Sequence, residues 1–234
     1  SDVCSSDLGV DASHRGTTIS TAMPVALEHY PRRRLYECFR HHPLPVLAIS
    51  TAIDISGYEA AVKDHGMRFY TTLCWLISKA INDNACFRHR IVDDVLVEFP
   101  LVHPSVVVGL DDGNMSFADA TYTGNVHADL ANLRAAMGAA RSRPNQDFTA
   151  GLEDRIFLTH LPWLSFTGIQ HPFTPLYASI PVISTGRSFR NEGKDMLPIA
   201  VQAHHALVDG RHVADLLAHL TDLCRQLDNL VCAT

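Results

Sequence analysis

Basic charge is scarce in this chain. It contains 19 Lys and Arg residues against 25 Asp and Glu residues, which gives a formal net charge of -6 at pH 7. Three consecutive arginines at positions 32–34 have no aromatic residues between them, and the run is too short to form a phosphate-binding surface. We therefore predict that the protein does not bind nucleic acid.

Long hydrophobic runs are also missing. No apolar segment approaches the roughly 20 residues that a helix needs to cross a bilayer, and the first residues lack the charged-then-apolar profile of a signal peptide. These absences predict a protein with no membrane segment and a cytoplasmic location.

Closely spaced cysteine pairs are absent from the sequence. Without CxxC spacing the cysteines suggest neither a zinc knuckle nor a disulfide framework, so we expect reduced and mostly buried thiols and no bound metal. The six are Cys4, Cys38, Cys74, Cys86, Cys224 and Cys232.

Length and composition suit a single large core. The chain has 234 residues, of which 47% are hydrophobic and 19% charged, and we favour one domain over two small ones. Residues 1–21 are polar and without periodicity, which indicates a disordered leader or a sequence artefact. The predicted domain therefore covers residues 22–234.

Hydrophobic periodicity predicts an alternating α/β protein. Helical spacing follows Ser56, which we expect to cap a helix ending near Gly66, and it returns at 71–87, 126–140 and after 210. Strand patterns occupy 45–55, 91–97, 105–118, 155–159, 164–167, 181–189 and 196–204. This order favours a two-layer sandwich in which a large mixed, mostly antiparallel sheet carries helices on one face.

The segment at 204–210 reads HHxxxDG and lies where a predicted strand turns into a helix. Such a junction holds a side chain rigidly at a sheet edge, which suits a general base. The residues alone also allow a Ser-His-Asp triad through Asp209, an ordinary turn, or a metal-dependent hydrolase site. The candidate ligands of such a metal site are His204, His205, Asp209 and His212. Adjacent histidines on an extended strand point apart, which disfavours the metal site.

Four segments, in order along the chain, resemble the chloramphenicol acetyltransferase family of CoA-dependent acyltransferases. They are YPR through ECFR at 30–40 with the strand to 55, FY at 69–70 with its helix, LPWLSFT at 161–167, and MLPIAVQAHHALVDGRHVADLLAHLTDLC at 196–224. The resemblance implies the fold of that family and transfer of an acetyl group from acetyl-CoA to a small hydroxyl acceptor, with chloramphenicol as the leading candidate.

The resemblance also assigns roles to individual residues. His205 matches the general base, and Ser165 matches the hydroxyl that stabilises the tetrahedral oxyanion. Asp209 matches an aspartate that pairs with an early arginine, here Arg32, and so supports the site without acting in a triad. His204 is then read as structural.

Acceptor and cofactor contacts follow from the same resemblance. Phe39 and Ser184 match acceptor-pocket positions, and Arg187 matches a basic residue near the CoA phosphate. Phe39 stands where drug-acetylating members tend to have tyrosine, and the pocket segment 168–180 is shorter than theirs, so another small alcohol or amine is an alternative acceptor.

Two further expectations concern the oligomeric state and the possibility that the protein is not catalytic. The resemblance implies a homotrimer with active sites between subunits. A non-catalytic binding member of the fold is the remaining alternative, although every candidate catalytic group is present.

Overall fold

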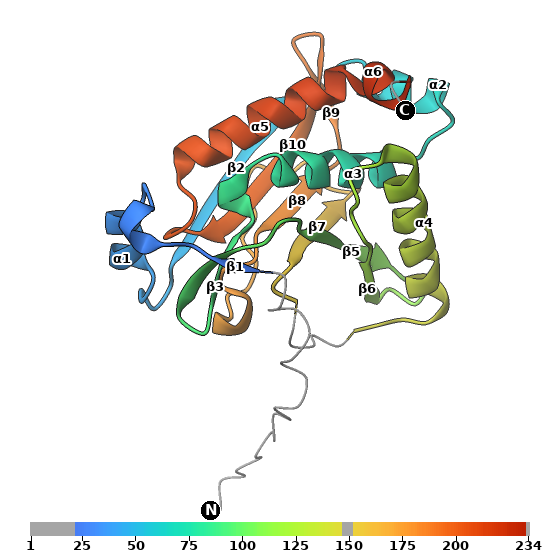
Figure 1. The fold of residues 1–234 in the computed structure, drawn as a ribbon. Helices are drawn as coiled ribbons and strands as arrows, with labels where there is room; N and C mark the ends of the chain where they lie inside the picture. The colour runs from blue at the N-terminus through green and yellow to red at the C-terminus, as the bar shows by residue number, and fades with distance from the viewer. Residues whose placement is uncertain (1–21, 147–151, 233–234) are drawn as a thin grey trace, which may run out of the picture.

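The computed structural model describes residues 22–146 and 152–232. Within these ranges the chain forms a large sheet with helices packed on one face and a small second sheet at one end (Figure 1). The expected leader at 1–21 lies outside the described residues. No helix in the described part of the chain combines the length and hydrophobicity of a bilayer span.

The large sheet has seven strands in the order β2-β10-β8-β7-β5-β6, with β9 paired to β10. Its strands are β2 (Val46–Asp54), β5 (His103–Gly109), β6 (Met115–Asp119), β7 (Arg155–Leu161), β8 (Val182–Gly186), β9 (Phe189–Asn191) and β10 (Lys194–His204). Strand β7 runs parallel to β5 and β8, and the other pairings are antiparallel. The mixed, mostly antiparallel sheet predicted from the sequence is confirmed.

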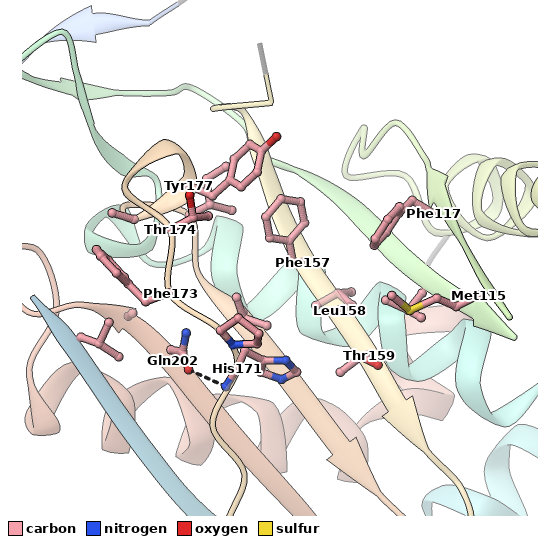
Figure 2. A pocket seen from close by; sticks show the side chains of 17 residues that line it. Met115, Phe117, Phe157, Leu158, Thr159, His171, Phe173, Thr174, Tyr177 and Gln202 are labelled. Atoms are coloured by element: carbon pink, nitrogen blue, oxygen red, sulfur yellow. Dashed lines mark hydrogen bonds between the residues drawn. The ribbon is translucent and has the colours of Figure 1, made fainter. Parts of the chain in front are cut away.

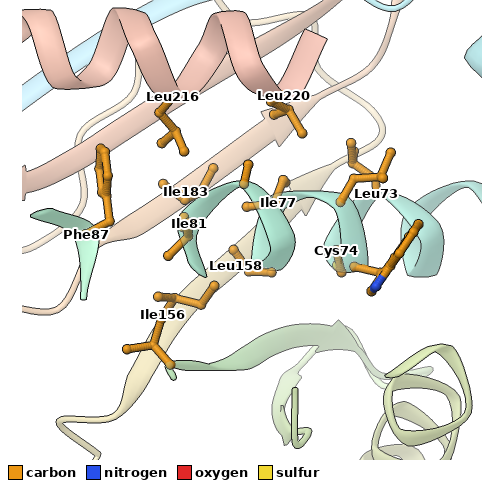
Figure 3. Close-up of a cluster of buried hydrophobic side chains, with 14 of the residues drawn as sticks. Leu73, Cys74, Ile77, Ile81, Phe87, Ile156, Leu158, Ile183, Leu216 and Leu220 are labelled. Carbon is orange, nitrogen blue, oxygen red and sulfur yellow. The ribbon is translucent and has the colours of Figure 1, made fainter. Parts of the chain in front are cut away.

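The main helices cover one face of this sheet. They are α3 (Phe69–Asn82), α4 (Val126–Ser142) and α5 (Gly210–Arg225), with shorter helices α1 (Arg33–Phe39), α2 (Tyr58–Asp64) and α6 (Leu227–Cys232) and short 3-10 turns at Leu27–His29, Ala85–Phe87 and Pro175–Tyr177. Apolar residues at helical spacing on α3 and α5 meet the inner face of β7 and β8 (Figure 3). Labelled members of this core are Leu73, Ile77, Ile81, Leu158, Ile183, Leu216 and Leu220.

A small sheet of β1 (Met23–Pro24), β4 (Val95–Glu98) and β3 (His89–Val92) is tied to the large one by a buried arginine. The Arg90 guanidinium is fully buried and donates hydrogen bonds to backbone carbonyls of Phe87, His89, Glu153 and Arg155 at 2.7–2.9 Å. These carbonyls satisfy its donors in place of a carboxylate. Burial lowers the pKa of Arg90 to about 9.

Three local predictions were wrong, each for a hydrogen-bonding reason. Ser56 does not cap α2: Gly57 is the N-cap, and the Ser56 hydroxyl accepts a hydrogen bond from the backbone N–H of Asp195. Residues 164–167 form no strand, because a turn places only the Leu164 carbonyl against the end of β8. The helix expected to reach residue 87 ends at Asn82. The Asn82 side chain is hydrogen-bonded to the backbone N–H and carbonyl of Val102, just before β5.

Candidate active site

His205 follows directly after β10 and is held from two sides. Its Nδ1 lies 3.1 Å from the Val208 carbonyl oxygen, and its ring lies 4.3 Å from the Phe39 ring of α1, centroid to centroid. A carbonyl oxygen only accepts, so Nδ1 carries the proton in the neutral ring and Nε2 is the unprotonated nitrogen. The half-buried imidazole is therefore oriented so that its basic Nε2 does not face the Val208 carbonyl oxygen.

Asp209 contacts Arg32 rather than the histidine. The two side chains form a hydrogen-bonded ion pair, and a second guanidinium nitrogen lies 3.4 Å from the His205 carbonyl oxygen. Burial alone would raise the pKa of Asp209, but hydrogen bonds from Arg32 and the His212 backbone, with the charge of Arg32, lower it to about 2. No hydrogen bond joins Asp209 to His205 among the described residues, so these two do not form part of a triad.

Asp209 also begins α5. As the N-cap it accepts hydrogen bonds from the backbone N–H groups of Arg211 and His212, and the His212 side chain accepts one from the backbone of Asp209. The carboxylate thus joins three elements: α1 through Arg32, the turn that carries His205, and the start of α5.

His204 belongs to the scaffold in this geometry. It is buried, and its Nδ1 accepts a hydrogen bond from the Ala206 backbone N–H at 3.2 Å. Burial, with a smaller contribution from neighbouring His205, lowers the pKa of His204 to about 4. The ring therefore stays neutral at neutral pH.

No group of three or more His, Cys, Asp or Glu side chains in residues 22–146 and 152–232 is placed to hold a metal ion. The side chains considered for a hydrolase metal site, at positions 204, 205, 209 and 212, are not gathered into such a group.

Ser165 and Arg187 form a second cluster, at the end of β8. The exposed Ser165 hydroxyl donates a hydrogen bond to the Arg187 carbonyl at 2.7 Å, and the Arg187 N–H donates to the Leu164 carbonyl at 2.7 Å. Arg187 is exposed and lies just beyond β8, not within the strand as expected. The Arg187 backbone is thus beside the serine, and its side chain is exposed.

Gly186, which the sequence reasoning missed, makes this close approach possible. A Cβ at this position would lie 2.6 Å from the Leu164 carbonyl oxygen and 3.1 Å from the Phe166 ring. A glycine inside a strand pattern is a known sign of close backbone approach, and this signal was available in the sequence.

A cavity of about 460 Å³ lies on the sheet face opposite the helices (Figure 2). Residues of β2, β5, β6, β7, β8 and β10 form its floor, and the loop after Ser165 forms its wall. Labelled lining residues are Met115, Phe117, Phe157, Leu158, Thr159, His171, Phe173, Thr174, Tyr177 and Gln202. The segment 168–180, expected to contribute to an acceptor pocket, supplies this wall.

Ser184 lies beneath the cavity and is fully buried. Its Oγ is 2.5 Å from Nε2 of His171, a residue that does line the cavity. The imidazole therefore lies between the Ser184 hydroxyl and the open space. No sequence signal singled out His171.

The two catalytic candidates lie at opposite ends of the sheet. Gly186 at the end of β8 pairs with Leu161, and the β8–β10 register places Val182, at the start of β8, beside Gln202. The Ser165 cluster is thus level with about Leu197, eight residues along the chain from His205, or roughly 25 Å at the rise of an extended strand. One chain does not bring His205 and Ser165 together.

Comparison with known proteins decides the family. The sequence model described as chloramphenicol acetyltransferase matches residues 22–221. The chain belongs to the chloramphenicol acetyltransferase family. Chloramphenicol acetyltransferase 3 of Escherichia coli is 27% identical over 204 residues, which cover 85% of this chain and 94% of that protein. A chloramphenicol acetyltransferase of Streptomyces acrimycini is 28% identical over 215 residues, covering 88% and 95%.

Solved structures of other proteins have the same fold as this chain. A chloramphenicol acetyltransferase aligns with a TM-score of 0.78 at 21% identity, over 87% of this chain and 99% of the other. A dihydrolipoamide acetyltransferase of Azotobacter vinelandii aligns with a TM-score of 0.60 at 14% identity, over 81% and 85%. These likenesses concern the fold, and the family match with its curated relatives makes the protein an acyltransferase.

Proposed function

We propose that the protein transfers an acetyl group from acetyl-CoA to a hydroxyl of a small, largely apolar acceptor, with His205 as general base and chloramphenicol as the leading candidate. The observation that carries this proposal is the orientation of His205. Its Nδ1 faces the Val208 carbonyl and its ring packs on Phe39, which presents Nε2 as a proton acceptor.

The reaction follows from these groups. His205 Nε2 removes the proton of the acceptor hydroxyl as that oxygen attacks the thioester carbonyl carbon. The Ser165 hydroxyl turns from the Arg187 carbonyl and donates a hydrogen bond to the oxyanion that forms. The tetrahedral intermediate then collapses, the C–S bond breaks, and the imidazolium returns its proton to the thiolate of CoA.

Two copies of the chain complete each site in this proposal. His205 and Ser165 are separated along the sheet within one chain, so a second copy has to bring its His205 to the cavity and Ser165 cluster of the first. A closed ring of three copies provides this contact three times by one repeated interface. The separation of the two clusters supports the homotrimer expected from the resemblance.

Supporting residues take defined places. The Arg32–Asp209 pair fixes the turn that carries His205. Arg187, exposed beside Ser165, suits a contact with a phosphate of CoA. The Phe39 ring packs on the His205 ring and has no hydroxyl group to offer the acceptor. Ser184 acts on the acceptor through the His171 ring, to which it is hydrogen-bonded.

An alternative acceptor is favoured by one observation. The cavity wall contains His171, a polar ring in a largely apolar lining. Such a lining accommodates other small alcohols or amines that carry an additional polar group, and the reaction is the same with these acceptors.

Thiol release from acetyl-CoA tests the proposal, with chloramphenicol and a panel of small alcohols and amines as acceptors. We expect His205→Ala to abolish transfer and Ser165→Ala to lower kcat by roughly two orders of magnitude. His29→Ala, at an exposed position, is the matched control. Full activity of His205→Ala would refute the mechanism, and transfer to chloramphenicol would support a role in antibiotic resistance.

A further inference from the structure

We propose that His171 determines acceptor specificity, by using its Nδ1 to hydrogen-bond a second hydroxyl group of the acceptor, apart from the hydroxyl that is acetylated. The inference rests on the proposed function, because it takes the 460 Å³ cavity as the acceptor site. It names the acceptor class as an alcohol with an apolar body and an additional hydroxyl.

The position of the imidazole is fixed by its surroundings. The His171 backbone N–H donates to the Gln202 side-chain oxygen at 3.0 Å, drawn as a dashed line in Figure 2, and Nε2 is 2.5 Å from the Ser184 hydroxyl. Two residues earlier, the Ile169 backbone N–H lies 3.4 Å from the Ser50 hydroxyl of β2. The ring is therefore anchored to β8, and its backbone to β10.

The other ring nitrogen has no hydrogen-bond partner in the described part of the chain. Nδ1 makes no hydrogen bond to any described residue, and it is not among the buried polar atoms that lack a partner. It is therefore accessible, and His171 lines the cavity. Burial lowers the pKa of His171 below its ordinary value, which keeps the ring neutral at neutral pH.

Two other polar groups of the lining already have a hydrogen-bond partner. The Gln202 oxygen already accepts from His171, and the Thr174 hydroxyl accepts from the Leu176 N–H. Phenylalanine, methionine, valine and proline side chains make up much of the remaining lining. A hydroxyl group fits Nδ1 in either tautomer of the ring, because it both donates and accepts.

A pair of acceptors that differ in one hydroxyl tests the inference: 1-phenylpropane-1,3-diol and 3-phenylpropan-1-ol. Binding of each is measured by calorimetry without acetyl-CoA, and the KM and kcat of each by thiol release. We expect the wild-type protein to bind the diol roughly five- to tenfold more tightly, as one neutral hydrogen bond allows.

The variants separate the two ring nitrogens. His171→Asn keeps a polar atom near the Nδ1 position and should retain part of the preference, whereas His171→Gln keeps one near Nε2 and should lose it. His171→Leu should also lose the preference through a higher KM for the diol, with little change in the KM for the mono-alcohol. Thr159→Val, a polar lining residue of β7, is the matched control and should retain it.

The outcomes are distinct. No preference in the wild-type protein, an unchanged preference in His171→Gln, or loss of preference in Thr159→Val alone would overturn the role of His171. A preference in binding without thiol release for any alcohol would support His171 as a recognition group and refute the acetyltransferase proposal. If His171→Leu does not fold, the Asn and Gln variants still decide.

Discussion

Gly186→Ala is expected to impair catalysis through backbone displacement alone. The backbone of Gly186 does not need the conformational freedom of glycine, because its φ lies outside the left-handed region. The effect is therefore steric. The new Cβ would lie 2.6 Å from the Leu164 carbonyl oxygen, whereas ordinary contact begins at 3.4 Å.

The geometry sets the size of the effect. Relief of the contact requires a separation of about 0.8 Å between β8 and the backbone that carries Ser165, and that backbone is held by the 2.7 Å bond from the Arg187 N–H. Overpacking of this kind costs about 1–3 kcal/mol of stability. Misplacement of a catalytic group by about 1 Å lowers the rate by up to roughly 100-fold.

The assay compares kcat and the unfolding free energy of Gly186→Ala and Gly109→Ala. Gly109 ends β5 as Gly186 ends β8, but a Cβ there meets nothing within 4 Å. For the Gly186 variant we expect kcat to fall by roughly 10- to 100-fold, because Ser165 would be displaced. For the Gly109 control we expect a near-normal kcat. Normal kcat in a folded Gly186→Ala protein would refute the argument that this contact positions Ser165.

Two further predictions concern buried or paired charges. Asp209→Asn should destabilise the protein by about 2 kcal/mol at pH 7, because the carboxylate pKa is lowered to about 2 from 3.8. This stabilisation is present above pH 4 and is lost as the pH falls through 2. The urea unfolding curves of variant and wild type should therefore converge near pH 2. A difference in unfolding free energy that stays constant with pH would contradict the role given to the Asp209 carboxylate. Arg90→Met leaves several buried carbonyls unpaired and should cost about 3 kcal/mol or more in urea unfolding, while activity per folded molecule is retained; an unchanged unfolding midpoint would contradict it.

Periodicity located most of the secondary structure because the sheet has one helix-covered face. The strand segments at 91–97 and 105–118 and the helix at 126–140 were predicted close to their observed bounds. Errors arose where a side chain or a turn made the hydrogen bond that the regular element would have made with a backbone group. At 164–167 the apolar alternation is that of a strand, yet the turn after β7 prevents a ladder.

The candidate site was predictable only in part. The HHxxxDG pattern and the family resemblance named the residues around His205, and the structure places Arg32 and Asp209 in contact there. Neither source revealed that His171 covers Ser184, because the pairing depends on how the loop before β8 crosses the sheet. Such long-range contacts between a loop and a strand leave no periodic signal in a sequence.

Because His205 and Ser165 occupy opposite ends of one sheet, a defect in the proposed oligomer extends beyond the chain that carries it. A His205-deficient chain disables the site on its neighbour, while its own Ser165 is served by the next copy. Chains deficient in one residue and chains deficient in the other, mixed at random in equal amounts, would regain about a quarter of the complete sites. A chain deficient in only one residue would not lower the number of complete sites that intact chains form, whereas a chain deficient in both, mixed at random in equal amounts with intact chains, would leave about a quarter of the sites complete and so act as a dominant inhibitor.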